Sequence, residues 1–366
     1  MTRRLETRPL AIVAAFSAAG LIALTVLALY IAQTVLIPIA FALVVAFVLW
    51  AVVSWMSRVP GLRALPGFVH HAVVLGLFVI AIVLTVNTLR SNGEILVQRI
   101  PQYSQNIIRL VADLDARFQI DQVIPGGLAK ILTANLDLEG VARQALGALG
   151  SLGGLIVVVL LYTAFLMIEY GGFVKKLHLA WPKGDKAARI IALSSDINSR
   201  IGGFLAVKTV INIVLGTLSY FALVAMGVEL AGFWAIYIGV LNYTPYLGSA
   251  AGVIGPTLMA LAQTGNIQHT LMTGAILAAL QFVIGSLIEP NLLGRRINLS
   301  PMMVLVSLAS WYALWGLPGA VLAVPMTVII LAVLGAIPFT RPAAILLSND
   351  GRIGDQPSGE GKQDQA

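Results

Sequence analysis

The sequence lacks cysteine entirely and holds few charged residues. Without cysteine there is no disulfide framework, thiolate metal site or thiol nucleophile, and the redox compartment is left open. Charged residues amount to 11% of the 366 residues, against about 25% in soluble globular proteins, while hydrophobic residues amount to 58%. A chain of this composition cannot build a water-facing surface of normal size. We therefore predict a membrane protein.

Signatures of enzymes and of nucleotide-binding proteins are also missing. The sequence contains no H-E-x-x-H, no G-x-S-x-G elbow and no Walker A loop, which argues against an enzyme and against transport driven by ATP hydrolysis in this chain. The four histidines lie at segment ends, with a spacing that does not suggest metal ligands. We predict no catalytic residue, no metal and no cofactor. The net charge of +7 is distributed as membrane topology requires, so we predict no nucleic-acid partner.

The apolar residues occur in long runs without alternation. In lipid, each backbone N–H and C=O must be paired within the protein, and such runs favour helices over a β-barrel. A spanning helix needs about 20 mainly apolar residues. Six stretches meet that test simply: 10–31, 36–56, 72–89, 152–168, 204–226 and 270–288. We predict an all-α, polytopic integral membrane protein.

Two further apolar stretches, 230–262 and 302–337, are too long and too interrupted for one straight helix. The interrupting residues are Pro245 and Pro256 in the first, and Gly316, Pro318, Gly319 and Pro325 in the second. Because proline removes an N–H and clashes one turn back, each stretch is expected to be a kinked span or a re-entrant hairpin. The chain then has about eight hydrophobic segments, two of them broken or re-entrant. Residues 247–256 and 317–325 also resemble each other, as in transporters built from inverted repeats.

The stretch 90–150 differs in composition from its surroundings. It has equal numbers of basic and acidic residues, and its apolar residues recur at helical spacing. We predict an amphipathic helical insertion outside the membrane, serving as a structural collar or as a contact for neighbouring subunits. The predicted division is 1–89 for three transmembrane helices, 90–150 for the insertion, 151–341 for a transport core of two helix-plus-broken-segment units, and 342–366 for a disordered cytoplasmic tail.

Lysine and arginine predict the topology, because they concentrate in cytoplasmic loops. With both termini in the cytoplasm and both broken stretches re-entrant, most of these residues lie on the cytoplasmic side, including those of the basic stretch 170–200. We therefore expect six crossings of the cytoplasmic membrane plus two hairpins. Eight full crossings are the alternative.

Polar residues coincide with the first break. Residues 242–248, with the sequence NYTPYLG, place side-chain donors and acceptors beside a proline and a glycine that open the helix. The functional interpretation is a binding site for a solute, to which backbone groups at the opening also contribute. The structural alternative is a packing kink with tyrosines at the membrane interface.

A second polar position ends the last simple span. Glu289 either faces a cavity or pairs at the interface with Arg295 or Arg296, because an isolated acidic group at bilayer depth is costly. Pro290 frees a carbonyl near residues 281–286, which could bind a cation or a solute.

Lys208 and Asn212 lie one turn apart on the 204–226 span and share a face. Lys208 either partners Glu289 or snorkels to the cytoplasmic interface, and we favour snorkelling. The predicted substrate- or ion-binding residues are Lys208, Asn212, Asn242, Tyr243, Thr244, Pro245, Gly248, Gln281, Glu289, Pro290 and Asn291.

Two motifs in these regions resemble those of the autoinducer-2 exporter family, which comprises bacterial permease-like membrane proteins. Glu289-Pro290, followed by Gly294 and by the LSP sequence at 299–301, resembles the family's E-P-x-x-x-G…(S/H)-P signature. Residues 243–248 are similar to its P-Y-(V/L/I)-G element, with Ser249 where the family usually has proline. The early IPIA sequence and the order of segments also fit, so that the resemblance covers about residues 10–337.

The resemblance implies a multi-pass protein of a bacterial inner membrane that exports a small solute, such as an autoinducer-2-like signal molecule. It also implies a homo-oligomer, for which we consider a pentamer. The expected partners are the solute or an ion, and the lipid bilayer. Some members of the family resemble sodium–proton antiporters, which is the alternative within the family. A membrane scaffold that transports nothing is the alternative from another class.

Overall fold

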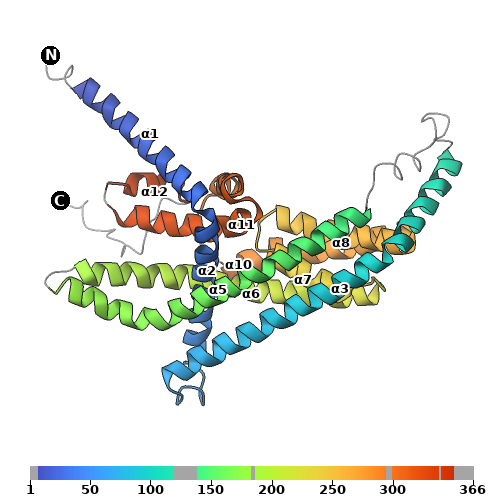
Figure 1. Cartoon of the computed structure of the whole chain (residues 1–366), viewed down its shortest axis with the longest axis horizontal. Helices are drawn as coiled ribbons and strands as arrows, with labels where there is room; N and C mark the ends of the chain where they lie inside the picture. The colour runs from blue at the N-terminus through green and yellow to red at the C-terminus, as the bar shows by residue number, and fades with distance from the viewer. Residues whose placement is uncertain (1–6, 119–137, 183–185, 294–298, 338, 350–366) are drawn as a thin grey trace, which may run out of the picture.

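The computed structural model describes residues 7–118, 138–182, 186–293, 299–337 and 339–349 (Figure 1). Over these residues the chain is helical, and its one β-bridge joins Leu299 to Ser348. The elements are α1 (Thr7–Ile31), α2 (Gln33–Met56), α3 (Gly67–Phe118), α5 (Leu138–Ala180), α6 (Lys186–Ala225), α7 (Ala231–Leu241), α8 (Leu247–Thr264), α9 (Ile267–Phe282), the π-helical segment η3 (Val283–Ile288), α10 (Glu289–Leu293), α11 (Pro301–Ala336) and α12 (Arg341–Leu347). The all-α prediction is confirmed.

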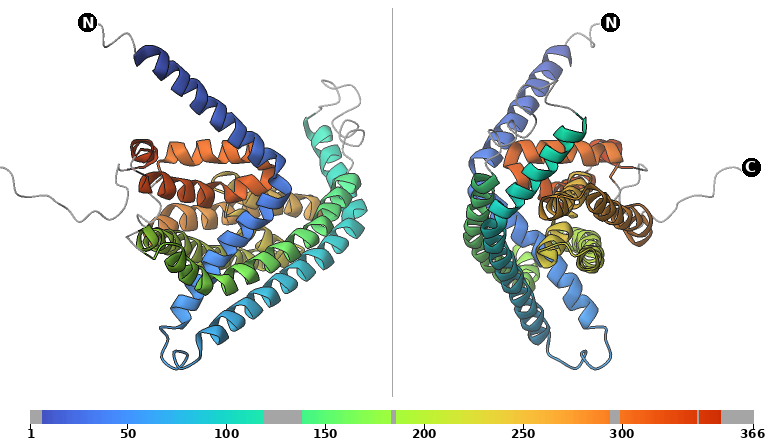
Figure 2. Two further views of the ribbon diagram at one scale, coloured as in Figure 1. Left: turned by 60° about the vertical axis from the view of Figure 1, so that its left-hand side comes forward. Right: turned by 90° about the vertical axis from the view of Figure 1, so that its right-hand side faces the viewer.

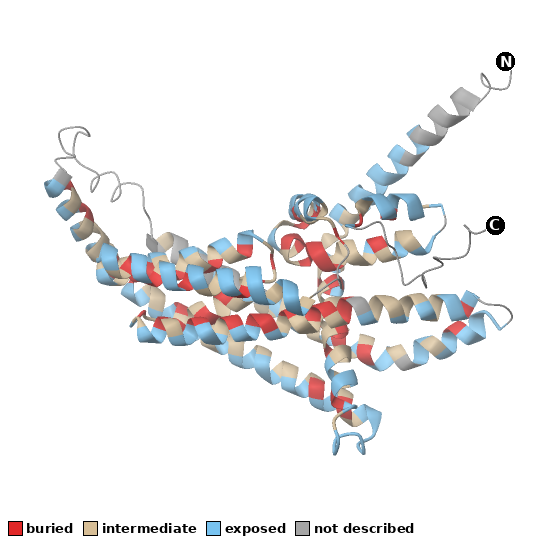
Figure 3. Ribbon diagram, turned by 180° about the vertical axis from the view of Figure 1, so that it is seen from behind, coloured by how far each residue is buried: buried red, intermediate tan, exposed pale blue. Residues whose placement is uncertain are grey.

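The surface of the described chain is that of a membrane protein. Six of its helices are long and apolar enough to cross a bilayer. The outward faces of the long helices are exposed (Figure 3), and they carry large apolar side chains such as Leu84, Phe165 and Phe221, each more than half exposed. Soluble proteins rarely expose apolar patches of this extent, because water would surround them unfavourably. Lipid removes that cost, so the fold is that of a polytopic membrane protein.

Three helices continue well beyond the apolar runs that predicted them. The helix α3 has 52 residues, and α5 and α6 have 43 and 40. At about 1.5 Å per residue, α3 is about 78 Å long, more than twice the roughly 30 Å hydrocarbon core. The described part of the 90–150 stretch is therefore a continuation of α3 and α5, and residues 119–137 lie outside the described part. The division of the chain into domains remains a prediction.

The stretch 230–262 is a helical hairpin. The chain reverses between α7 and α8, where Tyr246 adopts a left-handed φ of 62°, and the two helices pack against each other. A Cβ atom on Gly248 would clash with the carbonyl oxygen of Leu241, so only glycine permits this close return. Pro256 was predicted to interrupt the stretch, but it lies buried inside an unbroken α8. With 11 residues, α7 reaches about 16 Å and cannot span the core alone.

The last apolar stretch also reverses, at Gly316 inside α11. Gly316 has φ 65° and ψ −144°, and the halves on either side lie next to each other (Figure 2, left). The indole nitrogen of Trp311 donates a hydrogen bond to the Thr327 hydroxyl across them, at 3.1 Å. A Cβ atom on Gly319 would clash with the carbonyl oxygen of Trp311, as one on Gly248 would with Leu241. Both reversals thus depend on a glycine that allows the returning helix to approach a backbone carbonyl oxygen closely. The number of membrane crossings remains a prediction.

Of the glycines and prolines predicted to interrupt this stretch, only Gly316 has a non-helical backbone conformation inside α11. Pro318 and Pro325 lie within the second half of α11 and do not end it, because the conformation at Gly316 alone reverses the chain.

The predicted tail from 342 onward also needs correction over its first residues. Residues 342–347 belong to α12, and Ala344 is completely buried in an apolar cluster that also contains side chains of α6 and α11.

The helix α6 joins two apolar clusters. Towards its N-terminal side, Ile201 and Leu205 pack with α2 and the second half of α11. Towards its C-terminal side, Ile211, Leu215 and others pack with α7, α8 and α9. Lys208 falls between these two clusters, beside the reversal of the first hairpin.

Candidate functional site

A partly buried ion pair joins α6 to the start of α10, which follows α9 and η3. The ammonium nitrogen of Lys208 lies 2.5 Å from Oε1 of Glu289, and the two side chains are 7% and 21% exposed. Lys208 therefore does not snorkel as favoured from the sequence, but adopts the alternative of pairing with Glu289. Arg295 and Arg296, the other candidate partners of Glu289, lie outside the described residues. Pairing offsets the cost of placing either charge at membrane depth.

A chain of amide side chains lies beside this pair. Asn242, at the hairpin reversal, donates to Oδ1 of Asn212 on α6 at 2.8 Å, and its own Oδ1 accepts from Gln281 on α9 at 2.7 Å. The Ser249 hydroxyl makes a longer contact of 3.4 Å to the same oxygen. Asn212 and Asn242 are both buried. Three sequence segments thus meet through hydrogen-bonded amides, while the side-chain nitrogen of Asn212 is buried without a hydrogen-bond partner in the described part of the chain.

Tyr243, at the reversal of the first hairpin, forms a hydrogen bond with Thr209 of α6, about one helical turn from Asn212. The Tyr243 and Thr209 hydroxyl oxygens are 2.7 Å apart, and Thr209 also donates to the backbone carbonyl of Leu205 at 2.7 Å. Since a threonine hydroxyl has one proton, Tyr243 is the donor in the pair. Sequence analysis missed Thr209, although its position next to Lys208 placed it at the same depth.

The helix is wider than an α-helix in the six residues before Glu289. The segment η3 is π-helical and ends at Ile288, two residues before Pro290, whose nitrogen cannot donate to the carbonyl one turn back. Such π-helical turns are frequent at functional sites, because they displace side chains from the regular helical positions. Gly285 and Ser286 of this segment line a cavity together with Glu289. The predicted effect of Pro290 therefore corresponds to a real departure from α-helix.

These elements enclose a cavity of about 710 Å³. Its walls come from α6, the hairpin reversal with the start of α8, and the α9–η3–α10 helix. The lining residues are Lys208, Asn242, Pro245, Tyr246, Ser249, Ala250, Val253, Ile254, Ala278, Gln281, Phe282, Gly285, Ser286 and Glu289. We refer to it as the polar cavity. Its volume suits a small organic molecule, with a few polar groups placed among apolar walls.

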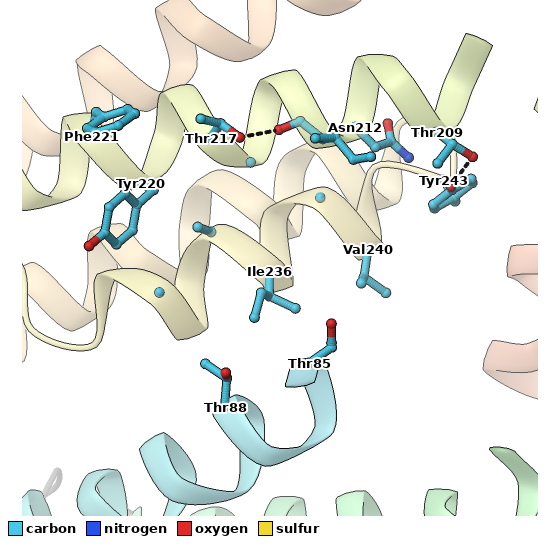
Figure 4. A pocket seen from close by; sticks show the side chains of 15 residues that line it. Thr85, Thr88, Thr209, Asn212, Thr217, Tyr220, Phe221, Ile236, Val240 and Tyr243 are labelled. Atoms are coloured by element: carbon cyan, nitrogen blue, oxygen red, sulfur yellow. Dashed lines mark hydrogen bonds between the residues drawn. The ribbon is translucent and has the colours of Figure 1, made fainter. Parts of the chain in front are cut away.

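A second cavity, of about 480 Å³, lies between α3, α6 and α7 (Figure 4). Asn212 and Tyr243 line it, together with threonines and apolar residues of the three helices. The hydroxyls of Thr88, Thr209 and Thr217 bond to carbonyls of their own helices, so this cavity offers few free polar groups. The hydrogen bond between Asn212 and Asn242 therefore separates a mainly apolar space from the polar cavity.

Six predicted residues do not line the polar cavity: Asn212, Tyr243, Thr244, Gly248, Pro290 and Asn291. Asn291 is exposed and donates to the carbonyl of Leu287 in its own helix at 2.7 Å. Thr244 is buried at the reversal, and Gly248 serves the close return of α8. Ser249 and Ser286 line the cavity but were not among the predicted site residues. Within the described residues, no group of three or more histidine or acidic side chains is placed to hold a metal ion.

Comparison with known proteins places the chain in a family. The sequence model of a family described as "AI-2E family transporter" matches residues 20–339. AI-2 transport protein TqsA of Escherichia coli K12 is 28% identical over 342 residues, covering 90% of this chain and 94% of TqsA. A protein of Borreliella burgdorferi, named for transport without a substrate, is 25% identical and covers 87% of this chain and 85% of its own length.

The YhhT protein of Escherichia coli K12, also named for transport, is 25% identical over 82% of this chain and 84% of its own length. These relatives are bacterial, and the range of the family model includes both hairpins. With the apolar helices described above, the match identifies a bacterial membrane protein and confirms the resemblance seen in the motifs. The chain belongs to the AI-2E family of transporters.

Proposed function

We propose that this chain is a secondary transporter that exports a small polar solute, of the autoinducer-2 type, across the bacterial inner membrane. The solute binds in the polar cavity. The observation that carries the proposal is the meeting of Lys208, Asn242, Gln281 and Glu289, from three distant segments, around one space beside a broken helix. Transporters place their sites at such breaks. The printed name of TqsA supports the choice of solute class.

The side chains favour a neutral solute with several hydroxyl or carbonyl groups. Lys208 and Glu289 neutralise each other, so the cavity has no unbalanced charge to attract a strongly charged molecule. Amide and hydroxyl groups from Asn242, Gln281 and Ser286 can both donate and accept hydrogen bonds. Both termini lie in the cytoplasm in this proposal, and the protein functions as a homo-oligomer.

Solute flux in reconstituted vesicles tests the binding site. We expect Asn242→Ala to lower the rate of autoinducer-2 efflux about 10-fold, because it removes a lining group and leaves the amides of Asn212 and Gln281 without their partner. Asn291→Ala is the matched control, since Asn291 is the same residue type outside the cavity. Equal flux in wild type, Asn242→Ala and Asn291→Ala would remove the assigned site.

Exchange of a cation for a proton is a second candidate function, favoured by the ion pair itself. A proton or Na⁺ that binds the Glu289 carboxylate competes with Lys208, so one site can bind two ions in turn. In vesicles with an imposed pH gradient, added Na⁺ should dissipate the gradient for wild type and not for Glu289→Gln. Dissipation by both proteins at the same rate would rule out this role of Glu289.

The scaffold alternative predicts a different property of the polar cavity. Because the chain has no cysteine, Ser286→Cys introduces a single reporter on the cavity wall. A transport cavity must admit water and a membrane-impermeant thiol reagent from at least one side. Complete protection of this cysteine from both sides would favour a scaffold in which the hairpins only pack.

A further inference from the structure

A cluster of hydrogen bonds fastens the far end of α3 to the base of the first hairpin. Arg99 forms an ion pair with Oε1 of Glu229, and the Tyr103 hydroxyl donates to Oε2 of the same carboxylate at 2.6 Å. Asn106 donates to the carbonyls of Ala262 and Gln263, at 3.1 and 2.8 Å. We call Arg99, Tyr103 and Asn106 the α3 clamp.

The clamp contacts both ends of the hairpin, namely the loop before α7 and the last turn of α8. Glu229 lies in the loop before α7, and Gln263 lies at the end of α8. The side chain of Gln263 joins the last turn of α8 to the loop before α7, because it donates to the carbonyl of Gly227 at 2.9 Å and accepts from the backbone N–H of Glu229 at 2.8 Å. The hairpin therefore has a closed base, held by α3, and its reversal at the other end forms part of the polar cavity.

These contacts are more specific than an exposed ion pair. The two oxygens of Glu229 have separate donors, one charged and one neutral. The Tyr103 ring is buried in the apolar cluster of α6 to α9, where it packs with residues such as Val228 and Met259. Asn106 satisfies carbonyls at the C-terminal end of α8, which have no partner within their own helix. Geometry of this kind fixes the position of α3 relative to the hairpin.

The other end of the apolar part of α3 belongs to a different cluster. Val74 packs with Leu49 of α2 and Met167 of α5. Tyr103 lies 29 residues further along, about 44 Å away in a continuous helix. The helix α3 thus connects the α2–α5 packing to the hairpin base, so a movement of the hairpin relative to α2 and α5 must either bend α3 or break the clamp.

We propose that the α3 clamp consists of positioning residues that set the balance between the two access states of the polar cavity. The proposal rests on the proposed function, because it assumes that the hairpin moves during transport. The clamp stabilises the state described here, and its release favours the other. Arg99, Tyr103 and Asn106 do not line the polar cavity and act on it only through the hairpin.

Labelling of Ser286→Cys from each side of the membrane tests the clamp in the full-length protein. We expect Tyr103→Phe and Glu229→Gln each to change the ratio of the two labelling rates about 10-fold, since coupling between distant sites commonly has this size. Tyr103→Phe keeps the buried ring and removes only the hydroxyl. Expressed as free energies, the effect of the double variant should be smaller than the sum of the two single effects. Both substitutions act on the same contact, between the Tyr103 hydroxyl and the Glu229 carboxylate.

An exposed ion pair elsewhere provides the matched control. Glu169 pairs with Lys176 at 2.8 Å within α5, and both side chains are about two-thirds exposed. Glu169→Gln should leave the labelling ratio unchanged. An equal change in Glu169→Gln, or no change in either clamp variant, would overturn the proposal. Failure of Tyr103→Phe to fold would also overturn it, by assigning these contacts to stability alone.

The outcome is separable from that of the proposed function, since labelling needs no solute. A changed ratio with no flux of any solute would reject the solute transport and keep the clamp. Normal flux with an unchanged ratio would reject the clamp and keep the transport.

Discussion

Replacing Lys208 by methionine is expected to lower the free energy of unfolding by about 3 kcal/mol, because it leaves the partly buried Glu289 carboxylate without its partner. Such a loss is large for a single substitution. The measurement is a reversible unfolding titration of the purified protein in mixed micelles. If Lys208 merely snorkelled to the interface, the same substitution would have little effect.

The double variant Lys208→Met with Glu289→Gln separates the ion pair from packing. We expect it to recover most of the lost stability, since neither charge remains to be desolvated. It should still be inactive in transport or exchange, because the polar cavity has lost both of its charged groups. A double variant as unstable as Lys208→Met would show that the ion pair is not the cause of the loss.

Gly248→Ala is expected to prevent the first hairpin from closing. The added Cβ atom would clash with the carbonyl oxygen of Leu241, and a backbone atom cannot rotate away as a side chain can. The reversal would have to open, and with it the contacts of Asn242 and Tyr243 to α6. We expect a destabilisation above about 4 kcal/mol, in the range reserved for severe structural conflicts. The measurement is the yield of monodisperse protein extracted from membranes.

Gly252→Ala is the matched control, one turn further along the same helix. Its added Cβ atom would lie 3.7 Å from Ile238, an ordinary van der Waals contact, so the yield should stay near that of wild type. Gly319→Ala should repeat the severe loss at the second hairpin, where the clash is with the carbonyl oxygen of Trp311. A normal yield for Gly248→Ala would contradict the close return of α8 described here.

The sequence specified the helical class and the position of the first reversal. Long apolar runs demand helices in lipid, since every backbone group must find a partner, and this requirement does not depend on the fold. The reversal at 242–246 was predictable because Pro245 removes a donor and Gly248 tolerates close approach, which are properties of single residues. The polar residues that line the cavity were visible for the same reason, since they stand out at bilayer depth.

Other features depended on packing. Pro256 and Pro325 carry the same local signal as Pro245, but the helix continues past each of them, and both are buried. The helix α3 also continues far beyond its apolar run and runs through Pro101, which by itself favours a break. A local sequence pattern shows where a helix can break, while the surrounding contacts decide whether it does break there.

The sequence by itself determined a helical membrane protein with a break at 242–246 and named most of the polar groups beside it. Only the tertiary structure decided that Lys208 pairs with Glu289, and that Asn242 bridges Asn212 and Gln281. Partners separated by 30 to 81 residues meet through the packing of α6 against α7 and α9, which no local pattern encodes. The cost of a buried charge shows that a partner must exist, but only three-dimensional proximity selects which one.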